Sequence, residues 1–330
     1  MKKYLTEIVF CFLLPALLIA AVAEYSLRKI PNDYAFKNQW LTKNSRDVEV
    51  LALGASSILY DVDPTYFSSK GFNAAHFSQS LKYDHFIYNK FIEQMPSLEY
   101  VIMGVDFWTP FGDIEDSPEW WRVKYYNIHY GSNYYRWLGK YNFELYFRDI
   151  PTFKRATNGF LSLLGLKEET NVAVNENGHG LHYTLENRAD NWDNGEFEAA
   201  RHNTLIIEGL HDSLIEQNRQ YMEEIIRKSA ERGVKVLLVN VPLYVSYRDT
   251  QNREFLKQQK DFCTYFVKEY NNVQFYDFSD DPRFTEEDFY DANHLNDIGT
   301  RKFTLFLDSI MVHQSSPLMT KNLLENDQQF

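Results

Sequence analysis

Cysteine is scarce in this chain, which has only Cys11 and Cys263 among its 330 residues. Two cysteines cannot build a disulfide framework, and Cys11 lies inside an N-terminal apolar run where pairing is not expected. Metal-binding patterns are scarce as well: His179 and His182 have the spacing of a metal pair, but no acidic or cysteine partners complete a ligand set around them. We therefore predict no metal site and no cofactor.

Positive charge is in deficit, because 34 Lys and Arg residues face 46 Asp and Glu residues and give a formal net charge of -12. A chain this acidic is not expected to bind nucleic acid or anionic lipid through general electrostatic attraction. Neutral or sugar-like substrates are compatible with this balance. Aromatic residues, in contrast, make up 16% of the chain, and many of them fall between residues 108 and 200.

The apolar run Ile8–Ala23 is free of charge and follows two N-terminal lysines. It is slightly short for a membrane span of roughly 20 residues and slightly long for a signal-peptide core of roughly 7–15 residues. Cleavage after Ala23 is an alternative, because Ala21-Val22-Ala23 fits a signal-peptide site. We favour an uncleaved transmembrane anchor over residues 1–24, with the lysines inside. The working domain is then expected outside the cytoplasm, on the periplasmic or extracellular face of a bacterial inner membrane.

The stretch Val48–Tyr60 predicts a buried strand that ends abruptly at Gly54-Ala55-Ser56. In parallel α/β sheets, a turn at the carboxyl end of a strand often holds reactive groups, because the next helix directs its N–H groups at whatever binds there. Ser56 is therefore a candidate nucleophile, although a serine in this position is most often a helix N-cap.

Strand and helix patterns alternate on both sides of the aromatic segment, which predicts an α/β fold with a roughly five-stranded parallel sheet. The predicted strands are 48–53, 71–76, 100–105, 234–241 and 273–276, and the predicted helices are 84–95, 205–232, 252–270 and 297–312. We expect this domain at 47–313, with an aromatic-rich insertion, a lid or cap, at about 108–200. A connector at 25–46 precedes the domain, and an unstructured tail at 314–330 follows it.

Asp291 and His294 stand in the connection after the last predicted strand, which topology can bring to the same sheet edge as Ser56. A serine hydroxyl needs a base to take its proton, and a histidine with a carboxylate on its other ring nitrogen supplies one. In the alternative interpretation, Asp291 caps the last helix and His294 packs against it. The pairing with a strand-end Gly-x-Ser favours the catalytic triad.

These two motifs resemble the first and last signature blocks of the SGNH, or GDSL-type, hydrolases. The resemblance implies a flavodoxin-like three-layer α/β/α fold in which Ser56 carries an acyl group, His294 is the base and Asp291 orients it. The apolar N-terminus together with the Asp-x-x-His-Leu-Asn block is similar to the envelope branch of that family. This branch includes the teichoic-acid D-alanine transfer protein and the accessory O-acetyltransferases of exopolysaccharide export.

The chain departs from the family where the oxyanion hole is expected. No glycine ends the second block, near Ser78 and Gln79, and Asp106 stands where the family has an asparagine. An ionised Asp106 would repel a developing oxyanion, and loss of one such donor can cost about 100-fold or more in rate. The alternatives are a protonated Asp106 that donates, or an Asp106 that orients substrate or loop while Ser78 or Gln79 donates.

The sequence thus predicts a membrane-tethered extracytoplasmic serine esterase or O-acyltransferase for acyl esters, commonly acetyl, of an envelope polysaccharide or glycolipid. A membrane acyltransferase partner stays open. The alternative function is a catalytically inactive glycan-binding or assembly protein that keeps the fold. The predicted site comprises the catalytic Ser56, Asp291 and His294, with Ser78, Gln79 and Asp106 as oxyanion or substrate-orienting residues.

Overall fold

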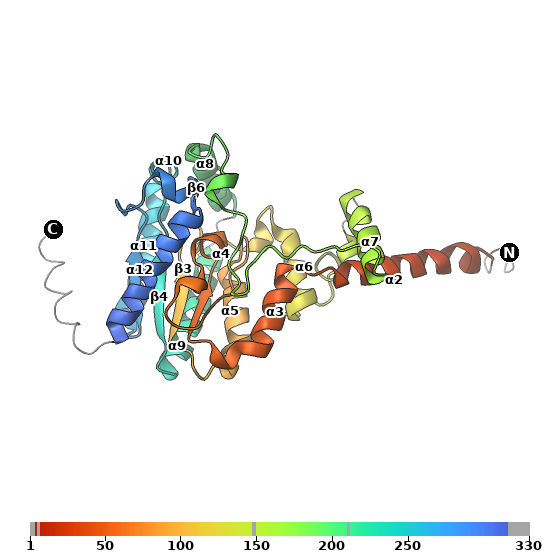
Figure 1. The fold of residues 1–330 in the computed structure, drawn as a ribbon, viewed down its shortest axis with the longest axis horizontal. Helices are drawn as coiled ribbons and strands as arrows, with labels where there is room; N and C mark the ends of the chain where they lie inside the picture. Colours follow the sequence, from red (N-terminus) through yellow and green to blue (C-terminus); the bar gives the residue numbers. More distant parts are fainter. Residues whose placement is uncertain (1–3, 5–6, 147–149, 210–211, 316–330) are drawn as a thin grey trace, which may run out of the picture. The chain divides into compact units, whose positions relative to one another are not determined.

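The computed structural model describes residues 4, 7–146, 150–209 and 212–315 of the chain (Figure 1). It contains two compact units. The first, which we call the N-terminal unit, comprises Met1–Gln39 and Glu119–Ala173, and the second, the sheet unit, comprises Trp40–Pro118 and Val174–Phe330. The aromatic-rich segment predicted as one insertion is thus shared between the two units.

The predicted five-stranded parallel sheet is confirmed, with the strand order β2-β1-β3-β4-β5. This is the order of flavodoxin-like doubly wound folds. The central strands are continuous apolar runs because helices cover both faces of the sheet. The strands are β1 Val50–Leu53, β2 Gly71–Asn73, β3 Tyr100–Gly104, β4 Lys235–Asn240 and β5 Val273–Asp277.

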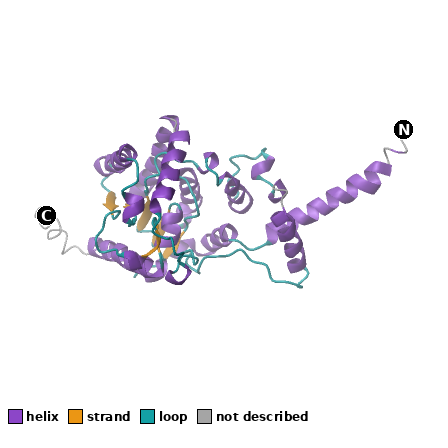
Figure 2. Ribbon diagram, turned by 90° about the horizontal axis from the view of Figure 1, so that it is seen from above, coloured by secondary structure: helices purple, strands orange, loops and turns teal. Residues whose placement is uncertain are grey.

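Helices form the two outer layers of the sheet unit (Figures 1 and 2). Helix α4 (Ser56–Asp61) packs against α12 (Asp297–Ser315) on one face. On the other face α5 (Leu81–Phe91) packs against α9 (Asp212–Glu231), and α9 contacts α11 (Arg253–Glu269) through a hydrogen bond from Tyr270 to Glu223 and a cation–π contact. The α/β/α layering is therefore confirmed.

Several predicted element boundaries were wrong. The helix predicted at 205–232 begins earlier, at Gly195, and is described as α8 (Gly195–Gly209) and α9 (Asp212–Glu231), while residues 210–211 lie outside the described part of the chain. The second predicted strand ends at Asn73, and residues 74–80 after it form a turn without strand pairing. The predicted connector is helical, and α12 extends to Ser315, whereas the rest of the predicted tail lies outside the described residues.

The N-terminal unit begins with an apolar helix. A π-helical turn, Val9–Leu13, continues into α2 (Leu14–Lys29), and α3 (Asp33–Asn44) follows. By length and composition the helical stretch Val9–Lys29 is able to cross a membrane, a test that a signal sequence also passes. The other helical elements in the unit include α6 (Val123–Tyr125), the π-helix Tyr126–Tyr130 and α7 (Ile150–Leu163).

Close approach of a side chain to two glycines fixes the position of α4 on the sheet. Gly104 is the last residue of β3, and a Cβ atom there would overlap the side chain of Ile58 in α4. At Gly54, after β1, a Cβ atom would lie 2.8 Å from Ile58 Cγ1. Ile58 is fully buried and occupies the space that side chains at both glycines would need.

Gly104→Ala should therefore destabilise the protein by about 1–3 kcal/mol, because the added methyl group must displace Ile58. Gly209→Ala is the matched control, since a Cβ atom there meets no other atom within 4 Å. Urea unfolding of the two variants in detergent tests this expectation. Equal midpoints for Gly104→Ala and the control would contradict it.

Candidate active site

The turn after β1 presents Ser56 at the start of a helix. Gly54 has a φ of +142°, a backbone conformation that side chains rarely allow. It lets the chain leave the strand sharply, so that α4 begins at Ser56 with Ala55 as its N-cap and no side-chain cap. The first N–H groups of a helix have no intrahelical carbonyl partner, so this end of α4 can donate to a bound oxygen.

A buried carboxyl group supports the turn from below. Asp84, in α5, accepts a hydrogen bond from the Gly54 backbone N–H, and its Oδ1 accepts one from Gln79 Nε2 at 2.6 Å. Burial raises the pKa of Asp84 to about 7, although both hydrogen bonds act to lower it. Asp84 thereby fixes the backbone two residues before Ser56.

His294 lies between Ser56 and Asp291. The residues Phe289–Asp291 (β6) and His294–Leu295 (β7) form a short antiparallel hairpin in which Asp291 pairs with His294. His294 Nδ1 is 2.9 Å from Asp291 Oδ1, and His294 Nε2 is 2.9 Å from Ser56 Oγ. The sequence predicted this juxtaposition, and each ring nitrogen faces the partner that a Ser-His-Asp triad requires.

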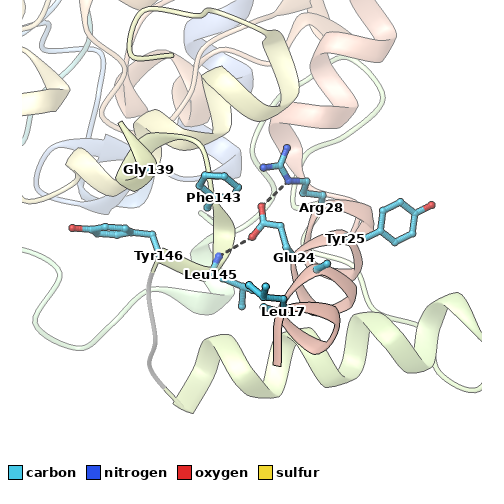
Figure 3. Close-up of a pocket in the computed structure, with 10 residues that line it drawn as sticks. Leu17, Glu24, Tyr25, Arg28, Gly139, Phe143, Leu145 and Tyr146 are labelled. Carbon is cyan, nitrogen blue, oxygen red and sulfur yellow. Dashed lines mark hydrogen bonds and ion pairs between the residues drawn. The ribbon is translucent and has the colours of Figure 1, made fainter. Parts of the chain in front are cut away.

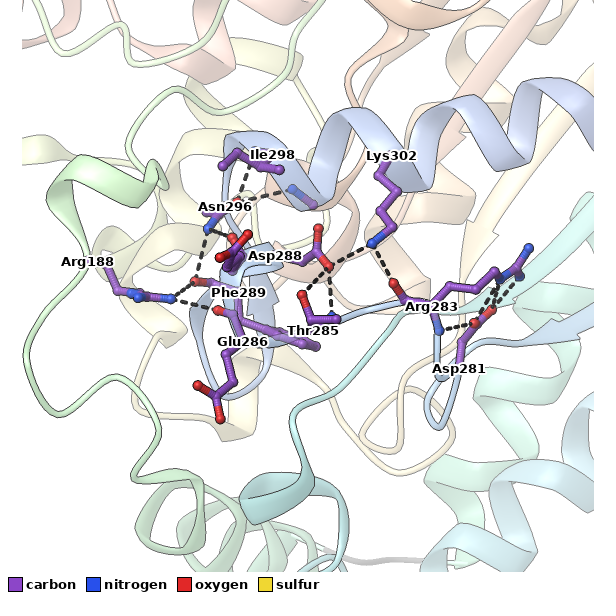
Figure 4. Close-up of polar contacts among 12 residues, drawn as sticks. Arg188, Asp281, Arg283, Thr285, Glu286, Asp288, Phe289, Asn296, Ile298 and Lys302 are labelled. Atoms are coloured by element: carbon purple, nitrogen blue, oxygen red, sulfur yellow. Dashed lines mark hydrogen bonds and ion pairs between the residues drawn. The ribbon is translucent and has the colours of Figure 1, made fainter.

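Polar contacts around the hairpin hold it in place (Figure 4). The side chain of Asn296 is fully buried, donates to the backbone oxygen of Phe289 at 3.1 Å and accepts from the N–H of Ile298 at 2.9 Å. It therefore joins the hairpin to the first turn of α12. Asp288, just before the hairpin, is paired with Lys302 of α12 at 2.8 Å. The His294 ring is thus carried by a hairpin that is bonded to a long helix.

Three carboxylates act on the charge of His294. Burial of the ring lowers the pKa of His294, but Asp291, Asp61 and Glu198 outweigh burial and raise this pKa to about 9. At neutral pH the ring therefore carries protons on both nitrogens in most molecules. Its capacity to act as a base increases as the pH rises toward that value.

Asp61 is a site residue that sequence reasoning missed. It is fully buried at the end of α4, and its Oδ1 accepts the N–H of Leu295 at 2.9 Å. Its Oδ2 has no hydrogen-bond partner among the described residues, and burial raises the pKa of Asp61 well above the ordinary value. Because Ser56 begins α4 and Leu295 follows His294, this bond connects the two segments that carry the predicted nucleophile and base. A lone aspartate five residues after the serine gave no signal of this role.

Asp106 is held by the loop that follows β3. Its Oδ1 accepts the N–H groups of Trp108 and Thr109, both at 3.0 Å, and the Thr109 hydroxyl at 2.9 Å. Its Oδ2 accepts a longer bond, 3.4 Å, from the hydroxyl of Ser57. The carboxylate therefore orders this loop and contacts the residue next to Ser56.

The other two predicted oxyanion residues lie in the turn after β2. Gln79 is buried and directs its amide to Asp84, as described above. Ser78 is half-buried and has a positive φ of 55°. The roles of Ser78, Gln79 and Asp106 toward an oxyanion stay predictions.

A stack of three tyrosines borders the histidine. The rings of Tyr60 and Tyr183 lie 3.7 Å apart between centroids, and those of Tyr183 and Tyr290 lie 4.0 Å apart. The edge of this stack meets His294, whose ring centroid is 5.0 Å from that of Tyr183. Tyr183 comes from the predicted insertion, so this segment contributes to the wall of the site. Among the described residues, no cluster of His, Cys, Asp and Glu side chains suited to a metal ion occurs.

Comparisons with known proteins do not identify a family for this chain. No known family profile matches the sequence, and no curated protein sequence matches it. Among solved structures, a match is found to the crystal structure of a Bacteroides fragilis protein described as a candidate acylhydrolase. The sequence identity is 10% and the TM-score 0.37, over 83% of this chain and 95% of that chain. We base no functional argument on this likeness.

Asp84→Ala should destabilise the sheet unit by about 2 kcal/mol or more, because two buried donors lose their acceptor. Asp84→Asn is the matched control, since its side-chain oxygen still accepts one bond. Thermal unfolding followed by circular dichroism measures the difference. An alanine variant as stable as the asparagine variant would show that Asp84 does not support the turn.

We expect the ring of His294 to titrate with a midpoint of about 9. In Asp291→Asn the midpoint should fall, because burial continues to disfavour the imidazolium while the nearest negative charge is gone. NMR of histidine-labelled protein measures both values, and His294→Gln assigns the signal. A midpoint near the ordinary value of 6.5 in the unsubstituted protein would refute this electrostatic account.

Proposed function

We propose that the sheet unit is a serine hydrolase or acyltransferase that cleaves acyl esters through Ser56, His294 and Asp291. The observation that supports it is the chain of hydrogen-bond distances from Asp291 through His294 to Ser56, each 2.9 Å at its shorter contact. Such a chain orients the ring nitrogen toward the hydroxyl that must lose a proton.

In the proposed reaction, Ser56 Oγ attacks the carbonyl carbon of an ester while His294 Nε2 takes the hydroxyl proton. The tetrahedral intermediate collapses when the C–O bond to the alcohol breaks, and the alcohol leaves with the proton from His294. The acyl group is then an ester of Ser56. Water or a sugar hydroxyl then attacks the carbonyl carbon of this ester while His294 Nε2 takes its proton. The bond between the acyl carbon and Ser56 Oγ breaks, and His294 returns the proton to Ser56 Oγ, which gives hydrolysis or acyl transfer.

Stabilisation of the oxyanion is proposed to come from the backbone N–H groups at the start of α4. These groups have no side-chain cap, and the first of them is the N–H of Ser56, the residue whose Oγ attacks. Asp106 already accepts three hydrogen bonds at one oxygen from its own loop. We therefore assign it to loop order and to the position of Ser57, and not to direct contact with the oxyanion.

We further propose that α2 is retained as a membrane anchor and that the substrate is an acylated glycan or glycolipid of the cell envelope. The helix continues unbroken through the potential cleavage site after Ala23. Its carboxylate Glu24 accepts the backbone N–H groups of Glu144 at 3.2 Å and Leu145 at 3.0 Å. The helix is therefore joined to the fold of the N-terminal unit directly after its apolar run.

A second candidate function is a glycan-binding or assembly protein without catalysis. The raised pKa of His294 favours it, because a protonated imidazole cannot accept the Ser56 proton at neutral pH. The two candidates differ in whether Ser56 reacts.

A serine-directed fluorophosphonate probe should label the detergent-solubilised chain, and the labelling should be lost in Ser56→Ala and His294→Gln. Hydrolysis of a small aryl acetate should fall by about 10³-fold or more in both variants, because each removes a member of one catalytic unit. Ser309→Ala, an exposed serine of α12, is the control and should keep full labelling.

Labelling that persists in Ser56→Ala would refute the assignment of the nucleophile. No labelling of the unsubstituted chain up to pH 9, together with measurable glycan binding, would favour the second candidate.

A further inference from the structure

Helix α7 of the N-terminal unit carries an apolar face that is not buried in the protein. Its side chains divide into three sets around the helix axis. The first set is small and buried and consists of Thr152, Ala156 and Gly159. The second set is large, apolar and exposed: Ile150 is 84% exposed, Phe153 58% and Phe160 42%, and Leu164, directly after the helix, is 56% exposed. Polar residues occupy the remaining side, as in helices that lie at a boundary between water and an apolar phase.

The small residues let α7 cross closely over α2. A Cβ atom at Gly159 would lie 2.9 Å from the backbone oxygen of Ser26, and Ala156 packs with Leu27 and Ile30. Figure 1 and Figure 2 show the two helices crossing, with α7 transverse to α2. The contact begins at Ala23, which packs against this cluster and is the last residue of the apolar run of α2 before charged residues begin.

A groove lies beside the apolar part of α2 (Figure 3). It has a volume of about 650 Å³ and is lined by Leu17 and Ala21 of α2 and by Phe143, Leu145 and Tyr146 of the facing segment. The groove therefore spans the level at which α2 changes from apolar to charged.

Polar contacts keep the facing segment at that level. Arg28 is paired with Glu24 at 2.6 Å and donates to the backbone oxygen of Asn142 at 2.5 Å. Lys124 and Glu144 form a buried ion pair at 2.7 Å. The aromatic residues near the groove are thus held by bonds to the helix and to the core of the unit, and their exposure does not come from a loose segment.

Aromatic side chains at the same level are exposed to an unusual extent. Tyr25, Phe143 and Tyr146, which line the groove, are each more than half exposed. Trp137, two residues before Gly139 of the groove lining, is 88% exposed. An isolated exposed aromatic residue is ordinary, but a contiguous apolar surface of this kind marks an interaction site. Tryptophan and tyrosine are the residues enriched where a membrane meets water.

We propose that the exposed face of α7, together with Phe143 and Tyr146 of the groove, inserts into the lipid bilayer. The inference rests on the anchoring proposed above. If α2 crosses the bilayer, a helix transverse to it at the end of its apolar run lies in the plane of the interface. Leu17 and Ala21 would then be within the hydrocarbon, so the groove they share with Phe143 is filled by lipid acyl chains. Lipid is favoured over a protein partner because α7 crosses α2 where the apolar run of α2 ends, with Ala23 packed in the contact.

The test uses the full-length chain in phosphatidylcholine vesicles with an environment-sensitive dye on single cysteines. Phe153→Cys and Phe160→Cys report on the apolar face, and Asn158→Cys on the polar side of the same helix is the matched control. These variants carry Cys11→Ser, and Cys263 is fully buried. In a separate sample the native Cys11, which is exposed within the apolar helix, reports on insertion of the anchor.

Vesicles that contain nitroxide-labelled phosphatidylcholine should quench the dye at 153 and 160, with loss of its accessibility to aqueous iodide, and should leave position 158 accessible to iodide. Quenching by iodide at all three positions would overturn the proposal. Protection from both quenchers at 153 and 160 would also overturn it, because a second copy of the chain would then cover the face. Absence of lipid quenching at Cys11 would instead refute the anchoring itself, so the two failures are distinguishable.

Discussion

The hydrogen bond from the Leu295 amide to Asp61 joins two segments that are 234 residues apart in the chain. It closes the sheet unit, because one segment begins with Ser56 and the other contains His294. The neighbouring bonds from Thr300 to the backbone oxygen of Tyr60 and from Asp63 to Thr304 connect the same end of α4 to α12. The distance between Ser56 and His294 is thus set by hydrogen bonds that join side chains of one segment to the backbone of the other. It does not depend only on the contact between the Ser56 and His294 side chains.

The carboxyl groups of Asp61 and Asp84 position the site, but burying them costs free energy when they are charged. Asp61 and Asp84 are both buried next to backbone amides, and burial raises the pKa of each. A neutral carboxyl group at either position keeps its hydrogen bonds without the desolvation penalty of a charge. Because Asp61 also acts on His294, the protonation of a structural residue affects the proposed base. One hydrogen-bonded network therefore both holds the segments of the site in place and affects the pKa of His294.

The sequence predicted those features that depend on the pattern of a few neighbouring residues. Buried strands appear as short apolar runs, and parallel strands bring their carboxyl ends to one edge, so the approach of Ser56 to the Asp291–His294 turn was predictable. Asp61 was not, because its partner is a backbone amide that no pattern marks. The start of α8 at Gly195 was missed because residues 195–200 fall in the segment interpreted as an insertion. The face of α7 was missed because aromatic clusters more often form a core. The fold topology can thus be predicted from local sequence patterns. An individual hydrogen bond such as that of Asp61 cannot, because its partner is distant in the sequence.

The packing of α7 against α2 has a practical consequence for the preparation of a soluble fragment. Leu27 and Ile30 are almost completely buried against Ala156, and each contributes on the order of 1.5–3 kcal/mol through burial. A fragment that starts at Glu24 retains both residues and the carboxylate that caps the Glu144–Leu145 segment. A fragment that starts at Asp33, after the whole helix, would leave the small-residue stripe of α7 facing solvent. The choice of first residue therefore decides whether the N-terminal unit keeps its folded form in the absence of lipid.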